Sequence, residues 1–291
     1  MWGVWLEFVW RVASVFVWVV VGLVAARVLL SRQGLFMGLS RRLGIPASLF
    51  LLSLGEARAA HVVLAEHLKT GAVGFRHVLK FSFVTWPLRV VLLHLRLGVV
   101  QVAVGSLGVL GLVYLGVVYI PSVVGLALGL WLGRGLRWPE VEAAARGLSA
   151  PSILRTAFSV AWRYAVFEAA FLVLDLLGLR VELGWLPLSP EALAVASIAA
   201  VRPTLGIMAA APPYWGGRMS GAEVLAALVV GRLVFMTLQE FPRSAVQFYG
   251  SIYPPAAAAR LVAYTAAVLF AVSLPVAAAL LWLAALNSSP P

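Results

Sequence analysis

The chain has 291 residues, of which 63% are hydrophobic and only 11% are charged, and its formal net charge is +11. Soluble domains carry roughly 25% charged residues, so this chain cannot cover a buried core with water-compatible side chains, and we predict an all-α integral protein of the cell membrane. The absence of cysteine excludes disulfides, thiolate metal sites and cysteine nucleophiles. The positive charge is typical of basic loops at the cytoplasmic face of a membrane. We expect no nucleic-acid binding, because no basic run is interleaved with aromatic residues.

Four apolar segments are near or above the roughly 20 residues that a membrane-spanning helix needs: 4–30, 98–120, 156–179 and 257–285. The first is too long for the apolar part of a signal peptide, which has about 7–15 residues, so we predict a retained transmembrane helix. Shorter apolar segments with polar interruptions lie between the four, at 45–55, 57–68, 76–94, 190–201, 203–212 and 222–250. A further apolar run follows Pro121, which we expect to kink or end the preceding helix.

The stretch 134–152 is the one clearly water-soluble part of the sequence, and we predict that it links a first membrane repeat, 1–133, to a second, 153–291. Three pairs of stretches match in the same order across it: "WRVASVFVWVVVGL" with "WRYAVFEAAFLVLD", "IPASLFLLSLGEAR" with "SPEALAVASIAAVR", and "TWPLR" with "EFPR". Arginine is concentrated in 31–44 and around the linker. The positive-inside rule therefore places the linker in the cytoplasm and both termini outside, so that the repeats have inverted topology, as in many secondary transporters.

Two pairs of short apolar segments meet at a polar break, at 55–58 in the first repeat and at 202–204 in the second. Each pair predicts a broken or re-entrant helical hairpin. The free backbone groups of such breaks need protein or water around them, and half-helices of this kind form the substrate site in transporters with inverted repeats. Another interpretation is that the arginines snorkel to an interface or pair with a nearby carboxylate. We predict that the substrate is bound at the tips by Arg58, Arg202, Glu56 and Thr204.

Other ionisable side chains lie in apolar stretches, where charged groups face the interior of a helix bundle and mark ion or proton routes. Glu168 and Asp175 are seven residues apart and share a helical face, and the unperturbed pKa of a histidine such as His61 is near physiological pH. A structural role stays open for each, as a hydrogen-bonded histidine, an internal ion pair, or an arginine that binds carbonyls next to a proline. The candidates for coupling or gating are His61, Glu168, Asp175, Arg89 and Arg243.

The stretch "HVVLAEH" contains the residue types of a zinc hydrolase, but not their spacing. His61 and His67 are six residues apart, which leaves them roughly 120° apart on a helix, whereas H-E-x-x-H places two histidines on one face. Neither a P-loop nor a G-x-S-x-G elbow occurs in this sequence. We therefore expect no catalytic residue, no metal site, no cofactor and no enzymatic activity.

A pattern of first helix, polar hairpin, Pro–Arg bend and long closing helix occurs twice and covers most of the chain. Its first copy contains "PASLFLLSLGEARAAHVVLAEHLKTGAVGFRHVLKFSFVTWPLR" and its second "SGAEVLAALVVGRLVFMTLQEFPR". This pattern resembles the nucleoside-recognition "Gate" domain of spore-maturation-type membrane proteins, archaeal polytopic proteins and the membrane part of bacterial ferrous-iron transporters. The resemblance implies transport of a solute or ion. The lack of a P-loop and of cysteine sets this sequence apart from the iron transporters.

We expect a multi-pass transporter that moves a small polar or anionic organic solute, including a nucleoside-like one, by alternating access. Its expected partners are membrane lipids and the solute, and the sequence leaves a homo-oligomer open. Two other function classes fit the same sequence. A flippase or other handler of anionic lipid headgroups would need a lateral opening at the hairpins, and a non-transporting membrane scaffold would have every arginine paired internally.

Overall fold

The computed structural model describes residues 2–29, 38, 42–55, 57–138, 150–176 and 183–288. Within these ranges every regular element is a helix and there is no strand, which confirms the all-α prediction. Most of the predicted linker 134–152 lies outside the described residues, and so does Glu56.

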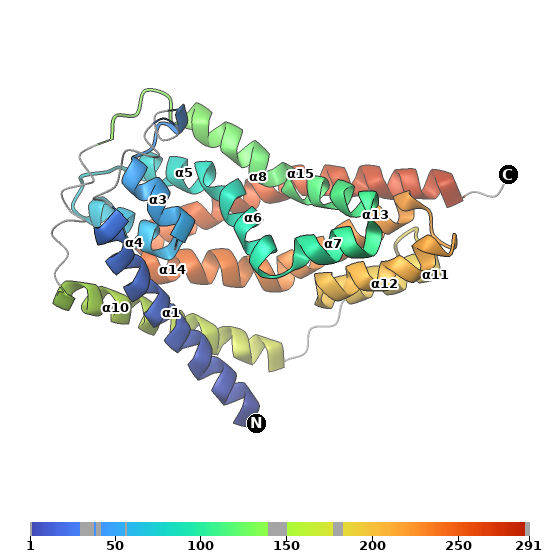
Figure 1. The fold of residues 1–291 in the computed structure, drawn as a ribbon, viewed down its shortest axis with the longest axis horizontal. Coiled ribbons are helices and arrows are strands. Elements are labelled where there is room, and N and C mark those ends of the chain that lie inside the picture. Colours follow the sequence, from blue (N-terminus) through green and yellow to red (C-terminus); the bar gives the residue numbers. More distant parts are fainter. Residues whose placement is uncertain are drawn as a thin grey trace. The chain divides into compact units, whose positions relative to one another are not determined.

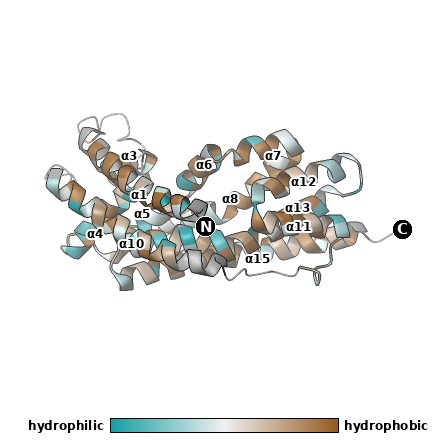
Figure 2. Cartoon of the chain, turned by 90° about the horizontal axis from the view of Figure 1, so that it is seen from below, coloured by the Kyte–Doolittle hydropathy of each residue, from teal (hydrophilic) through white to brown (hydrophobic). Residues whose placement is uncertain are grey.

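Three of the described helical stretches are long and apolar enough to cross a membrane: Val109–Leu132, Gly221–Ile252 and Pro255–Leu286. A fourth span would result if Phe75–Val84 and Trp86–Leu95, which are bent by 41° at their junction, cross it together. Hydrophobic residues cover most of these helices (Figure 2). The predicted spans 98–120 and 257–285 therefore overlap two of the three stretches, whereas 4–30 and 156–179 form helices outside this set.

The chain divides into two compact units, which do not coincide with the two predicted repeats, 1–133 and 153–291. Unit 1 consists of Met1–Arg89, Gly125–Gly178 and Arg243–Thr265, and unit 2 of Val90–Val124, Leu179–Pro242 and Ala266–Pro291. Each unit therefore takes segments from both repeats, and three of the passages from one unit to the other lie inside the long apolar helices.

In unit 1, helix α1 (Trp2–Leu29) packs along α10 (Ala150–Leu176), as Figure 1 shows, and also contacts the first hairpin. That hairpin consists of α3 (Ala47–Gly55) and α4 (Ala57–Lys69), close to the predicted bounds. The second hairpin helix, α4, also contacts α5 (Phe75–Val84) and α14 (Phe248–Ile252). The interior of the unit contains large, fully buried side chains: Leu49, Leu64, Phe81, Phe83 and Tyr253.

In unit 2, the second hairpin consists of α11 (Pro190–Val201) and α12 (Pro203–Trp215), and both helices pack on α13 (Gly221–Phe235). Ser189 caps α11 by accepting a hydrogen bond from the amide of Ala192. Pro203 begins α12, where its missing N–H is not needed. Helix α12 also packs on α7 (Val99–Leu107), which belongs to the first sequence repeat.

Small residues bring the backbones of the second hairpin and α13 into close contact. A Cβ atom at Gly231 would lie 2.6 Å from the Cβ of Ala199, and one at Gly206 would lie 2.6 Å from the Ala199 Cα. Since real Cβ atoms do not approach other atoms this closely, both positions need glycine. Helices α11, α12 and α13 therefore form one tightly packed block.

The long apolar helices contain breaks in their regular bonding. Helix α8 (Val109–Leu132) continues through Pro121, so of the two expected outcomes the proline does not end the helix, and a kink stays a prediction. After α13 the helix changes to π geometry in η2 (Met236–Glu240) and η3 (Pro242–Gln247) before α14, and Pro242 cannot donate a backbone hydrogen bond there. Helix α15 (Pro255–Ser288) contains Pro275.

Candidate functional site

A cavity of about 220 Å³ lies in unit 1 between α4, α10 and α14. Helix α4 lines it with residues spaced three and four apart, Val62, Ala65, Glu66 and Lys69, which is the spacing of one helical face. Its polar lining is completed by α10 and α14. The polar side chains of the wall are Glu66, Lys69, Arg155, Thr156, Ser159, Arg163 and Ser251.

A polar stripe on α10 forms one side of this cavity. Arg155, Ser159 and Arg163 are spaced four residues apart, so that each lies about 40° around the helix from the one before. Both arginines are exposed, and the long aliphatic part of each can lie along the helix while the guanidinium reaches the cavity. Phe158 and Trp162 lie next to this stripe on the exposed surface of α10, whereas residues on the opposite side of the helix, such as Ala157 and Ala161, are buried.

The cavity contains more positive than negative groups. Lys69 donates to Glu66 at 2.7 Å, and this pair is largely neutral. Arg155 and Arg163 make no ion pair with the residues that the structure describes. Two guanidinium groups without a carboxylate partner among these residues, beside three hydroxyls, therefore favour a bound anion, because Arg presents N–H donors in the fork geometry that carboxylates and phosphates accept.

Glu168, a predicted coupling residue, lies buried in unit 1 at the centre of a hydrogen-bonded network. One carboxylate oxygen accepts a hydrogen bond from Nη1 of Arg11 at 2.6 Å, and the other accepts from Nε2 of Gln247 at 2.9 Å. Gln247 also donates to the backbone carbonyl of Tyr164 at 3.2 Å. The network joins α1, α10 and η3, so Glu168 holds these three elements together. Its role in coupling stays a prediction.

The guanidinium of Arg58 lies over the ring of Tyr164, with its Cζ 5.5 Å from the ring centroid. This geometry is that of a cation–π contact. Arg11 and Arg243 also lie within electrostatic range of the Tyr164 hydroxyl. The structure thus brings two predicted residues, Arg58 and Arg243, to the surroundings of a third, Glu168.

His61 is fully buried in unit 1 and lies among aromatic rings. Its Nδ1 is 2.8 Å from the hydroxyl of Tyr253, whereas its Nε2 has no hydrogen-bond partner among the described residues. Arg89 donates from Nη2 to the backbone carbonyl of Ser82 at 3.0 Å and to the hydroxyl of Tyr249 at 3.4 Å. Both predicted coupling residues are therefore bonded to tyrosines of the α14 segment, Arg89 to Tyr249 at its start and His61 to Tyr253 just after its end.

The remaining predicted residues belong to unit 2 or have side chains outside the described part of the structure. Arg202 is exposed in unit 2, where it lies between α11 and α12, and Thr204 is half-buried at the start of α12. Arg58 belongs to unit 1, so the pairing of Arg58 with Arg202 stays a prediction. The side chain of Asp175 and the whole of Glu56 lie outside the described residues.

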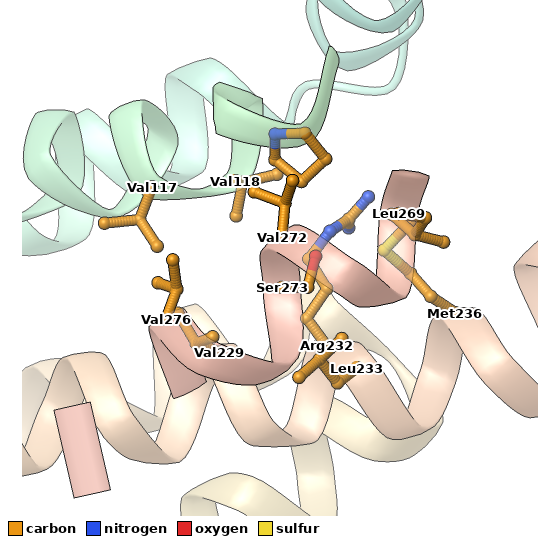
Figure 3. A pocket seen from close by; sticks show the side chains of 11 residues that line it. Val117, Val118, Val229, Arg232, Leu233, Met236, Leu269, Val272, Ser273 and Val276 are labelled. Atoms are coloured by element: carbon orange, nitrogen blue, oxygen red, sulfur yellow. The ribbon is translucent and has the colours of Figure 1, made fainter. Parts of the chain in front are cut away.

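A second, smaller cavity of about 30 Å³ lies in unit 2 between α8, α13 and α15 (Figure 3). Its walls are aliphatic apart from Arg232 and Ser273. Arg232 is 6% exposed, and Figure 3 shows its side chain rising from α13 toward the labelled residues of α8 and α15. It forms an ion pair with Glu240, with 3.1 Å between Nη2 and Oε2.

Two groups of functional candidates were missed by the sequence reasoning. The stripe of Arg155, Ser159 and Arg163 could have been found from its four-residue spacing in a largely apolar helix. The pair of Arg232 and Glu240 had no such signal, because residues eight apart in a regular helix are about 12 Å apart along its axis, and the intervening π geometry is not visible in the sequence.

Among the residues that the structure describes, no group of three or more histidine, aspartate or glutamate side chains could hold a metal ion. Comparisons with protein-family models, with curated proteins and with solved structures find no match to this chain.

Proposed function

We propose that the protein is a multi-pass membrane transporter for a small anionic organic solute. The observation that carries this proposal is the cavity between α4, α10 and α14, where Arg155 and Arg163 have no carboxylate partner among the described residues and lie beside hydroxyl groups. Charged side chains without partners are costly in a membrane protein and usually face a cavity or a substrate path.

The size and chemistry of the cavity narrow the solute class. At about 220 Å³ it is smaller than the roughly 300–1,000 Å³ of typical drug-sized ligand sites. The guanidinium groups of Arg155 and Arg163 favour a carboxylate or phosphate group, and the hydroxyls of Thr156, Ser159 and Ser251 can bind oxygen atoms of the same solute. A phosphorylated or carboxylated metabolite fits this description better than a neutral nucleoside.

A reciprocal packing pattern supports the inverted repeats that alternating access would use. In unit 1 the second helix of the first hairpin, α4, packs on α14, which precedes the closing helix α15 of the second repeat. In unit 2 the second helix of the other hairpin, α12, packs on α7, which precedes the closing helix α8 of the first repeat. Each hairpin thus packs on the equivalent helix of the other repeat, as an internal two-fold relation requires. The resemblance to the Gate domain, with termini outside and the linker in the cytoplasm, belongs to the same proposal.

The test is an uptake screen in proteoliposomes with small carboxylates, phosphate esters and neutral nucleosides. The double variant Arg155→Ala/Arg163→Ala is compared with the wild type, with Arg58→Ala and Arg202→Ala, and with Arg218→Ala, which removes an exposed arginine of unit 2 as a control outside the cavity. We expect uptake of an anionic solute that the double variant loses and Arg218→Ala keeps.

The same proteoliposomes, prepared with a fluorescent anionic lipid in one leaflet, measure lipid translocation. Translocation that depends on Arg155 and Arg163, without uptake of any soluble anion, would support the lipid-handling alternative instead. Uptake that is equal in all variants would refute the assignment of the site.

A further inference from the structure

A line of hydrogen-bonded side chains connects four helical elements of unit 2, and we call it the ionic cluster: Glu240, Arg232, His94 and Tyr119. Nη2 of Arg232 lies 3.1 Å from Oε2 of Glu240 and also 3.1 Å from Nε2 of His94. Nδ1 of His94 lies 3.2 Å from the hydroxyl of Tyr119. His94 belongs to α6 (Trp86–Arg96), Arg232 to α13, Glu240 to η2 and Tyr119 to α8.

Hydrogen-bond chemistry determines where protons lie in the ionic cluster. Arg232 can only donate, so Nε2 of His94 must be the acceptor, and the ring proton of His94 is on Nδ1, from where it is donated to Tyr119. A second proton on His94 would lie on Nε2, where its N–H would face the N–H donors of Arg232 and no hydrogen bond could form. Glu240 is therefore the one group of the cluster that can take up a proton without a clash between donors. Tyr114 also lies within electrostatic range of Arg232 and Glu240, and as a neutral phenol it adds no charge. Arg243, which keeps its charge throughout, follows Glu240 by three residues.

The pair of Arg232 and Glu240 is poorly hydrated. The side chain of Arg232 is 8% exposed and that of Glu240 is 22% exposed, and Nε of Arg232 is buried without a hydrogen-bond partner among the described residues. Neutralising one member of a buried pair leaves the other charge uncompensated, which is strongly unfavourable. Protonation of Glu240 would thus leave Arg232 in need of water or another anion.

Three irregularities of the long helices meet at the cavity that Arg232 lines (Figure 3). Pro121 of α8 is part of its wall, Met236 is the first residue of the π segment η2, and Ser273 lies two residues before Pro275 of α15. Proline removes a helical hydrogen bond, and π segments are frequent at functional sites. The volume of about 30 Å³ exceeds the roughly 10–15 Å³ that one water needs, so small shifts at these breaks suffice to hydrate the cavity.

We propose that Glu240 is a proton-binding site whose protonation opens the Arg232 cavity to water. One proton passes from water to a carboxylate oxygen of Glu240, the ion pair with Arg232 is lost, and Arg232 keeps its own proton, so that the cluster gains one positive charge. Coupling of this step to solute movement rests on the proposed transport function. The opening itself does not depend on any solute.

The natural chain has no cysteine, so Ser273→Cys places a unique thiol in the wall of the cavity. Its rate of modification by a water-soluble thiosulfonate is measured from neutral to mildly acidic pH, with Glu240 intact and with Glu240→Gln. Comparing the two proteins at each pH cancels the ionisation of the thiol. At neutral pH we expect the thiol to react about tenfold faster in the Glu240→Gln protein than in the protein with Glu240 intact, as for a minor open state that becomes the major one. The ratio of the two rates is expected to approach one on acidification.

Two further variants identify the proton-binding group. Glu240→Asp keeps a carboxylate and is expected to retain the pH dependence, and His94→Gln is expected to retain it as well. The proposal is overturned if Glu240→Gln keeps the pH dependence of the wild type, if His94→Gln alone abolishes it, or if Ser273→Cys reacts equally fast under all conditions.

Uptake assays separate this proposal from the proposed function. With an imposed inward proton gradient, Glu240→Gln is expected to lose the stimulation of uptake while it retains exchange of solute across the bilayer. Uptake that no gradient affects would refute the coupling and leave the transport function standing. Cysteine accessibility that follows Glu240 without uptake of any solute would refute the transport function and leave the proton-driven opening.

Discussion

Nδ1 of His61 and the hydroxyl of Tyr253, 192 residues apart in the sequence, lie 2.8 Å apart in the interior of unit 1. The imidazole also lies edge-on to the rings of Phe81, Phe248 and Tyr249, with centroid distances of 5.1–5.5 Å. The contact joins α4 of the first hairpin to the end of α14. It fixes one of the two reciprocal hairpin contacts by a specific polar bond within a largely aromatic environment.

Replacing Tyr253 by Phe removes one hydrogen-bond partner and leaves the other buried. Because Nδ1 of His61 would then be unsatisfied at a site that is 0% exposed, we expect a loss of about 1–3 kcal/mol in the free energy of unfolding. Thermal unfolding in detergent measures the loss. Tyr264→Phe, at an exposed tyrosine of α15, is the control, and an equal effect of both changes would contradict the importance of the contact.

Replacing Arg11 by Ala leaves the carboxylate of Glu168 without its cation, although Gln247 still donates to it. The loss of one partner of a buried ion pair costs about 3–5 kcal/mol, and we expect less here because the side chain of Arg11 is 37% exposed. Glu168→Gln in the Arg11→Ala background should recover most of the stability. A double-mutant cycle on thermal unfolding measures this coupling, and strictly additive effects would show that the two side chains do not interact.

Replacing Glu66 by Gln removes the carboxylate from the described wall of the unit 1 cavity and keeps the shape of that wall. Since Lys69 would be released from its ion pair, an anionic solute would meet three free cations instead of two. Exposed pairs contribute roughly 0.2–1 kcal/mol, so we expect KM for the transported anion to fall by about two- to fivefold. The proposed anion site would be contradicted by a rise in KM.

Replacing Gly231 by Ala places a methyl group 2.6 Å from the Cβ of Ala199 and against the carbonyl of Ala196. Overpacking of this kind costs about 1–3 kcal/mol. Gly116→Ala in α8 is the matched control, because nothing lies within 4 Å of its added Cβ, and there the better helix propensity of alanine should stabilise the protein slightly. Equal stability of the two variants would contradict the close packing of α11 on α13.

Single cysteines in the cysteine-free chain test the orientation in the membrane. We expect a membrane-impermeant thiol reagent to label Ser288→Cys, near the end of the chain, in intact cells and to label Ser149→Cys, in the linker, only after permeabilisation. The opposite pattern would invert the proposed topology. It would leave the cavity between α4, α10 and α14 unaffected.

Much of the helical architecture could be predicted, because apolar periodicity and polar breaks depend on local sequence. The four hairpin helices begin and end near the predicted residues, since Gly55 and Pro203 act on the backbone directly. Whether Pro121 would end its helix or only kink it could not be decided from the sequence, because a proline ends a helix only where the freed carbonyl and the bend cannot be accommodated, and in a long apolar helix neighbouring segments can do so.

The candidate site was predicted less well, because it depends on which helices become neighbours. Arg155 and Ser159 acquire a role only when α10 lies beside α4 and α14. Likewise, Arg232 and Glu240 meet only because the π segment intervenes. Single polar residues in apolar helices could be recognised as candidates, whereas their partners across helices could not.

The glycine contacts of Gly206 and Gly231 have a mechanical consequence. A block of helices held backbone to backbone is stiff, so a force applied to the second hairpin is passed on without being absorbed by side-chain rearrangement. Bending in unit 2 is then expected at the few described places where the regular α-helical hydrogen bonding is interrupted, at Pro121, at 236–240 and at Pro275. The rigid block of α11, α12 and α13 and the irregular positions are thus separate parts of the chain. Mutations that loosen the packing of the block should therefore weaken a conformational change in unit 2 even when the irregular positions are unchanged.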